Sequence, residues 1–168
     1  MKRWFIIVMI AFSVSACFST PIQDLDVART SLNTQRYLAT LERCTDGDTA
    51  RFLVEGESIS VRFLSIDTPE LARDGLAAQP YAQEAANLAC THLQKADEIL
   101  LELDPYQDSQ DRYGRWLAYV WVDEVLLQEI LIEAGLADLR YAHEVSLYDD
   151  QLHRILKLIQ ARRLGRWK

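Results

Sequence analysis

The stretch from Ser58 to Glu70, SISVRFLSIDTPE, combines the pattern of a strand with three charged residues that can do chemistry. β-Branched and aromatic residues alternate along it, which predicts a strand. Pro69 must end that strand, because proline donates no backbone hydrogen bond. One rigid element would then carry a guanidinium, Arg62, and two carboxylates, Asp67 and Glu70. Such an element can hold a cation and an anion close together.

The same residues also have a purely structural interpretation. Thr68-Pro69-Glu70 is a good helix start, with threonine as the N-cap, proline at the first helical position and a carboxylate near the positive end of the dipole. Asp67 would then be a turn residue, and Arg62 would be a surface residue of the strand. A short motif alone leaves both interpretations open.

The elements that must position these residues follow from the periodicity of the apolar residues. Strands are predicted at 37–44, at 50–54, from Ser58 onward, at 99–103 and at 115–122, with a hairpin turn at Glu55-Gly56-Glu57. Helices are predicted at 81–95, 125–134 and 147–163. Five short strands with a helix between the third and the fourth predict an α+β fold, a five-stranded OB-type Greek-key barrel with three helices.

Composition sets limits on the class of protein. The chain has 168 residues and is 49% apolar, which is enough for the core of one domain. Its formal charge is −7, with 18 basic and 25 acidic residues. This balance excludes a nucleic-acid binder that works through bulk electrostatics, although it allows a local cationic cleft.

The N-terminus has the pattern of a targeting segment, and residues 1–16 are predicted to be a signal peptide. Lys2 and Arg3 precede a short apolar run that falls below the roughly 20 residues needed to span a bilayer. Val14-Ser15-Ala16-Cys17 resembles the bacterial lipobox, in which the cysteine is lipidated. The alternative is an ordinary secretory signal in which Cys17 is incidental.

Lipidation is the favoured interpretation, because a cysteine directly after three small residues is otherwise unusual. It predicts an extracytoplasmic protein anchored to the membrane through Cys17, in the outer membrane if the source has one. Residues 17–36 are polar and are predicted to be a tether, with a short N-terminal helix as the alternative. Residues 37–168 are predicted to be the folded domain.

Two further cysteines, Cys44 and Cys90, have two equally good interpretations. They can form a disulfide in an extracytoplasmic protein, or each can be a buried free thiol. Because the chain has three scattered histidines and no CxxC motif, the sequence does not support a zinc site.

Three motifs, in this order, resemble those of the staphylococcal nuclease (thermonuclease) family. They are Asp46-Gly47-Asp48-Thr49, Arg62 with Asp67-Thr68-Pro69-Glu70, and Asp111-Arg112-Tyr113-Gly114-Arg115. Each motif is weak by itself, and Asp-Gly-Asp-Thr alone is more often a tight turn. Together they form a strong signal that covers the chain from about Tyr37 to its end.

The resemblance implies a monomeric, calcium-dependent endonuclease that hydrolyses DNA and RNA with little sequence specificity and leaves 3′-phosphate ends. Calcium prefers oxygen ligands, which would come from Asp48, Asp67 and the backbone carbonyl of Thr68. Glu70 would be the general base or orient the attacking water. The phosphate would be clamped by Arg62 and Arg115, and the nucleotide pocket would be lined by Tyr113 and Tyr141.

The chain departs from the family's pattern in three ways. It is acidic, whereas well-known members are basic. His143 replaces a tyrosine, and Trp116 replaces a small residue, which predicts a narrower cleft.

The alternative function is a non-catalytic OB module that binds single-stranded nucleic acid or a protein partner. A structural envelope lipoprotein is a third possibility. The full set of site residues favours the nuclease, because binding modules usually lose some of them: Asp48, Arg62, Asp67, Glu70 and Arg115.

Overall fold

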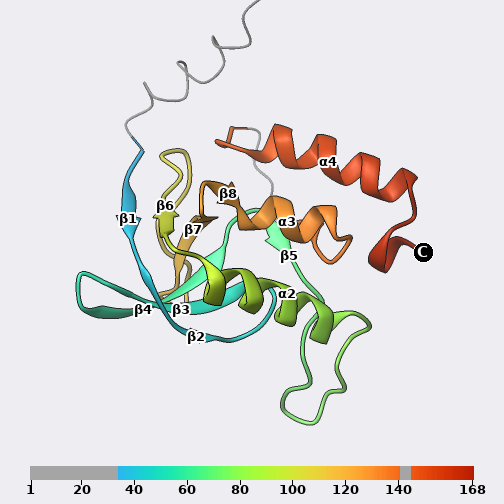
Figure 1. Ribbon diagram of the computed structural model, residues 1–168, viewed down its shortest axis with the longest axis horizontal. Helices are drawn as coiled ribbons and strands as arrows, with labels where there is room; N and C mark the ends of the chain where they lie inside the picture. The colour runs from blue at the N-terminus through green and yellow to red at the C-terminus, as the bar shows by residue number, and fades with distance from the viewer. Residues whose placement is uncertain (1–33, 141–144) are drawn as a thin grey trace, which may run out of the picture. The chain divides into compact units, whose positions relative to one another are not determined.

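A computed structural model describes residues 34–140 and 145–168 (Figure 1). Residues 34–168 form one compact unit. The predicted signal peptide, the predicted lipidation site Cys17, most of the predicted tether, Tyr141 and His143 lie outside the described residues. Within the described part of the chain, no helix is long and apolar enough to cross a membrane.

In the part of the chain that the structure describes there are nine strands, and seven of them belong to one sheet. They are β1 (Arg36–Leu38), β2 (Thr40–Cys44), β3 (Thr49–Val54), β4 (Glu57–Phe63), β5 (Ile66–Asp67), β6 (Ile99–Glu102), β7 (Trp116–Val122), β8 (Val125–Leu126) and β9 (Asp138–Leu139). The seven-stranded sheet runs in the order β1-β6-β7-β4-β3-β2, with β8 beside β7, and β5 pairs separately with β9.

The large sheet closes on itself, because β1 and β2 are halves of one extended segment. The segment bends at Ala39, whose N–H donates to the carbonyl of Ile99 at 3.0 Å. β1 pairs with β6 and β2 pairs with β3, so the bent segment joins both ends of the sheet. Counting it as one strand, and leaving aside the two-residue β8, the predicted α+β class and five-stranded OB-type barrel are confirmed. In this barrel β4 pairs with β7 in parallel.

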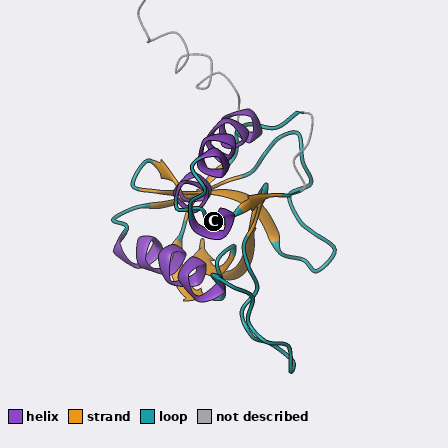
Figure 2. Ribbon diagram, turned by 90° about the vertical axis from the view of Figure 1, so that its right-hand side faces the viewer, coloured by secondary structure: helices purple, strands orange, loops and turns teal. Residues whose placement is uncertain are grey.

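Within residues 34–140 and 145–168, three α-helices accompany the barrel: α2 (Ala82–Lys95), α3 (Leu127–Glu133) and α4 (Asp149–Ala161), followed by a 3-10 turn at Gly165–Trp167. α3 packs against α4 and against β7. Figure 1 shows α3 beside α4, and Figure 2 shows the helices (purple) around the strands (orange). The second predicted helix is shorter than expected, since its first two residues pair with β7 as β8. No helix begins at Thr68-Pro69-Glu70, which excludes the helix-start interpretation of that motif.

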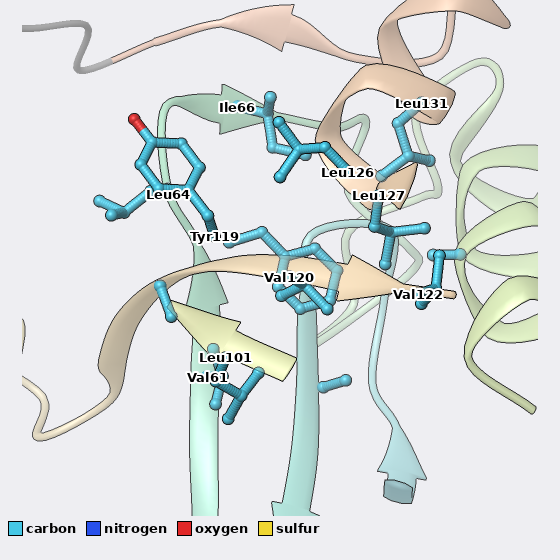
Figure 3. Packing of buried hydrophobic residues seen from close by; sticks show 14 of the residues in the cluster. Val61, Leu64, Ile66, Leu101, Tyr119, Val120, Val122, Leu126, Leu127 and Leu131 are labelled. Atoms are coloured by element: carbon cyan, nitrogen blue, oxygen red, sulfur yellow. The ribbon is translucent and has the colours of Figure 1, made fainter. Parts of the chain in front are cut away.

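The hydrophobic core lies between the barrel and α3. Figure 3 shows Tyr119, Val120 and Val122 of β7 beside Leu126, Leu127 and Leu131, with Ile66 of β5 close by. These side chains belong to one buried cluster. Ile66 of β5 is therefore buried in the core, and this fixes the position of the next residue, Asp67.

A disulfide joins Cys44, at the end of β2, to Cys90 in α2. This decides between the two interpretations that the sequence leaves open. The bridge closes a separation of 46 residues. It also fastens α2 next to the Asp46-Gly47-Asp48 turn, which begins two residues after Cys44.

Candidate active site

Most of the predicted site residues meet in one cavity of about 850 Å³. Its walls come from the start of β3, the β4–β5 turn and the polar loop before β7. The predicted residues among those that line it are Asp48, Arg62, Asp67, Glu70, Tyr113 and Arg115. Thr68 lies directly behind this wall and is buried.

The guanidinium of Arg62 gathers the two predicted metal ligands. Its Nη2 atom lies 3.2 Å from Oδ2 of Asp48 and 3.3 Å from Oδ1 of Asp67. Its Nη1 atom donates to the carbonyls of Phe63 at 2.9 Å and Ile66 at 2.7 Å. One half-buried side chain therefore holds the carboxylates together and also shapes the turn from β4 into β5.

Asp48 is buried at the back of the site. Its Oδ2 atom accepts the N–H of Thr68 at 2.8 Å, and its Oδ1 atom accepts the hydroxyl of Thr49 at 3.1 Å. Burial raises the pKa of Asp48 above its usual value, and the positive charge of Arg62 opposes this effect without cancelling it. The fold thus holds a carboxylate where a neutral group would be easier to bury.

Gly47 lets the Asp46-Gly47-Asp48 turn approach its neighbours closely. A Cβ atom at this position would lie 2.6 Å from Oγ1 of Thr68 and 2.9 Å from Cβ of Ala85 in α2. Its backbone does not need a positive φ, so lack of space, rather than an unusual dihedral, requires glycine here. Asp46 completes the turn by accepting the N–H of Asp48 at 3.1 Å.

Arg115 is held in place by Asp111, a residue that the sequence motif contains but that was not predicted to belong to the site. Oδ2 of Asp111 lies 2.7 Å from Nε of Arg115, and Oδ1 accepts the backbone N–H groups of Tyr113 and Arg115. Burial alone would raise the pKa of Asp111, but these donors outweigh it and lower the pKa. The feature of the sequence that could have predicted this contact is the four-residue spacing between the opposite charges of Asp111 and Arg115.

Tyr113 stands exposed at the rim between two guanidinium groups. Nη2 of Arg112 donates to its hydroxyl at 2.6 Å, and Cζ of Arg112 lies 4.7 Å from the ring centroid. Cζ of Arg115 lies 5.7 Å from the same centroid. The ring and the cations therefore form one surface that can meet a base and its phosphate.

Glu70 is exposed at the mouth of the cavity. Its backbone N–H donates to Oε1 of Gln79 at 3.1 Å, and its carboxylate lies 3.5 Å from Nη2 of Arg73. Solvent therefore reaches the carboxylate. This placement suits a group that acts on a water molecule.

Trp116 does not narrow the cavity, so that prediction is wrong. Its ring packs edge-on against Tyr37, with ring centroids 5.0 Å apart, and it is not one of the described residues that line the cavity. Strand alternation is the reason: Arg115 and Leu117 face the cavity, while Trp116 between them faces the other way.

Arg140 is a further residue beside the site, and the sequence motifs did not predict it. Its Nε atom lies 3.3 Å from Oδ2 of Asp67, so both oxygens of Asp67 face a guanidinium. Arg140 follows β9, which pairs with β5. Since its sequence separation from Asp67 is 73 residues and no motif includes it, no signal in the sequence pointed to this contact.

The donor set suits a hard cation such as calcium, which takes oxygen ligands. The carboxylates of Asp48 and Asp67 lie within 3.3 Å of one nitrogen atom of Arg62, and Thr68 adjoins Asp67 with its backbone carbonyl. Among the described residues, no three acidic, histidine or cysteine side chains form a ready-made metal cluster. A cation bound here would therefore complete its coordination shell with the backbone carbonyl of Thr68 and with water molecules.

Comparison with known proteins shows the family. The staphylococcal nuclease homologue family matches residues 60–168. Endonuclease YncB of Bacillus subtilis (strain 168) is 40% identical over 113 residues, 67% of this chain and 53% of that protein. The SPbeta prophage-derived endonuclease YokF of the same organism is 37% identical over 129 residues, 76% of this chain and 43% of that protein. Thermonuclease of Staphylococcus hyicus is 32% identical over 125 residues, 74% of this chain and 72% of that protein.

The chain belongs to the staphylococcal nuclease family, as its motifs predicted. The family match covers Arg62, Asp67, Glu70 and Arg115, whereas Asp48 precedes it and is placed at the site by the pairing of β3 with β4. The chain spans about half the length of YncB and YokF.

If burial of the charge dominates at Asp48, Asp48→Asn will be at least as stable as the wild type at pH 7 in the presence of a chelator. The raised pKa means that the folded state binds a proton more tightly than the unfolded state. The wild type therefore loses stability as the pH rises from the pKa of Asp48 in the unfolded state to its pKa in the folded state. The advantage of the variant should therefore disappear as the pH falls to about 4. Urea denaturation at both pH values measures this difference. A variant clearly less stable than the wild type at pH 7 would show that the ionised carboxylate stabilises the fold.

Proposed function

We propose that the protein is an endonuclease that hydrolyses phosphodiester bonds in DNA and RNA with calcium as its cofactor and leaves 3′-phosphate ends. The observation that carries this proposal is the grouping of Asp48 and Asp67 around Arg62 in a cavity that also holds Glu70 and Arg115. Family membership supports the same chemistry, since relatives are named endonuclease and thermonuclease.

Each residue has a role that its position supports. Glu70 is exposed at the mouth, where its carboxylate can accept a proton from an attacking water. Arg115, whose Nε is held by Asp111, presents the rest of its guanidinium to the equatorial oxygens of the phosphate. Arg62 supplies positive charge at the back of the cavity. Tyr113 offers its exposed ring to a base.

Asp48, Asp67 and the carbonyl of Thr68 are the groups that would hold calcium. When bound, the ion would supply charge neutralisation for the developing phosphorane and orient the reacting oxygens. Carboxylates outnumber arginines among the residues that line the cavity: Asp46, Asp48, Asp67, Glu70 and Asp111 against Arg62, Arg73, Arg112 and Arg115. A bound calcium ion would turn this small excess of negative charge into an excess of positive charge, and would thereby strengthen the attraction of a nucleic acid to an acidic protein.

We also propose that the protein acts outside the cytoplasm as a monomer attached to the membrane by a lipid on Cys17. The sequence around Cys17 and the disulfide between Cys44 and Cys90 support this location, because disulfides persist in oxidising compartments.

Cleavage assays with the mature protein on single-stranded DNA, duplex DNA and RNA test the proposed activity. We expect cleavage in calcium and none in chelator. Glu70→Gln should reduce kcat by roughly 10²–10⁴-fold because it removes the base, and Arg62→Ala should reduce it by about 10²-fold or more. Glu57→Gln and Arg51→Ala are matched controls outside the cavity and should cleave like the wild type.

Two results would contradict the proposal. Cleavage that persists in Glu70→Gln and Arg62→Ala would place the chemistry elsewhere. Salt-dependent binding of single-stranded DNA without any cleavage would favour the non-catalytic OB module instead.

The lipid anchor has its own test. Cys17→Ser in the full chain should move the protein from the membrane fraction to the soluble fraction, because one cysteine carries the lipid. Immunoblots of both fractions measure this, with Cys90→Ser as a control for loss of a cysteine. A Cys17→Ser variant that stays in the membrane fraction would exclude lipidation as the means of attachment.

A further inference from the structure

We propose that Arg140 is a substrate-binding residue that contacts a phosphate adjacent to the one being cleaved, so that the site favours polynucleotides over short fragments. This inference rests on the proposed nuclease function, which it makes more specific. It starts from the position of Arg140 beside β5.

The short ladder of β5 and β9 fixes the face on which Arg140 lies. Ile66 pairs with Leu139 and Asp67 pairs with Asp138, and the N–H of Arg140 donates to the carbonyl of Ser65 at 2.9 Å. Opposed residues of an antiparallel pair share a face. Ile66 belongs to the core cluster and Leu139 packs against it, whereas Asp67 lines the cavity. Arg140 is not among the lining residues, but its ion pair with Asp67 places its guanidinium at the edge of the cavity wall.

The side chain of Arg140 is anchored at one atom and open at its end. Its Nε lies 3.3 Å from Oδ2 of Asp67, while the side chain as a whole is 59% exposed. Within 34–140 and 145–168, no partner is found for its Nη1 or Nη2 atom. Arg62 differs in this respect, because its Nη1 and Nη2 atoms contact two carbonyls and two carboxylates.

An uncommitted guanidinium fork matches the geometry of a phosphate, which it can bind through two parallel hydrogen bonds. A polynucleotide carries a phosphate on each side of the scissile one, and a dinucleoside monophosphate carries none. The anchor on Asp67 keeps the fork close to the proposed calcium ligand and limits the freedom that binding would remove. The expected ligand of Arg140 is thus a flanking phosphate.

A simpler role for Arg140 is to neutralise Asp67 and Asp138, two carboxylates that lie opposite each other on the ladder. That role would affect the chemical step on every substrate alike. A flanking-phosphate contact would affect binding, its salt dependence and the preference for long substrates. The two roles are therefore separable by experiment.

The test compares the wild type with Arg140→Ala, Arg140→Lys and Arg51→Ala. Arg51 is the matched control, because it loses the same charge on β3, where its Nη1 donates to Ser58 outside the cavity. Fluorescence anisotropy in chelator gives the Kd for a labelled single-stranded oligonucleotide across a salt series. Kinetics at saturating calcium then give kcat and KM for that oligonucleotide and for a dinucleoside monophosphate.

We expect Arg140→Ala to raise the Kd of the oligonucleotide about tenfold and to reduce the salt slope by about 0.7, the value for one lost contact with a single strand. The ratio of kcat/KM for long over short substrate should fall by a similar factor. Arg140→Lys should lie between Arg140→Ala and the wild type, because it keeps the charge and loses the fork. Arg51→Ala should match the wild type.

Equal losses of kcat on both substrates, with Kd and salt slope unchanged, would overturn the inference and leave Arg140 only a positioning residue for Asp67. A wild type that binds through Arg140 but cleaves nothing would uphold the inference and overturn the nuclease proposal. A wild type that neither binds nor cleaves would overturn both.

Discussion

The site depends on one guanidinium that is surrounded by oxygen atoms. Arg62 lies within hydrogen-bond or ion-pair distance of two carboxylates and two backbone carbonyls. Without it, Asp48 and Asp67 would repel each other across a half-buried space, and the carbonyls of the β4–β5 turn would lose their donor. The same contacts leave Arg62 little freedom to move, so its charge is already in place when an anion arrives.

The barrel and α2 provide the rigid frame for this arrangement. Strand pairing sets β3 beside β4, which brings the turn containing Asp48 next to Arg62. The disulfide between Cys44 and Cys90 holds the turn that contains Asp48 close to α2. Gly47 in this turn also packs closely against Thr68 and Ala85. Asp48 is therefore held at the back of the site, where Arg62 and the donors of Thr49 and Thr68 meet its carboxylate.

Local signals in the sequence were sufficient for most of the fold. Alternating apolar residues predicted the barrel strands, and helical spacing predicted all three helices, because those periods reflect burial along a single element. The grouping of Asp48, Arg62, Asp67 and Arg115 was predicted from the resemblance of three motifs to the staphylococcal nuclease family. Each of these residues lies near a strand end or in a turn.

Contacts between distant segments were not accessible in this way. The pairing of β5 with β9 brings Arg140 to Asp67, and two residues of Val125–Leu126 leave a helix pattern to pair with β7. The bond between Cys44 and Cys90 likewise requires the packing of α2 on β2. In each case tertiary packing decides the outcome, and local propensity carries no information about it.

Calorimetric titration of calcium into the wild type and Asp67→Asn is the most direct test of whether Arg62 gathers these carboxylates into a cation site. We expect the wild type to bind a single calcium ion saturably and Asp67→Asn to bind it at least about tenfold more weakly, because one of two carboxylate ligands is lost. Binding that is unchanged in Asp67→Asn, or that is absent from the wild type, would contradict a calcium site at this position.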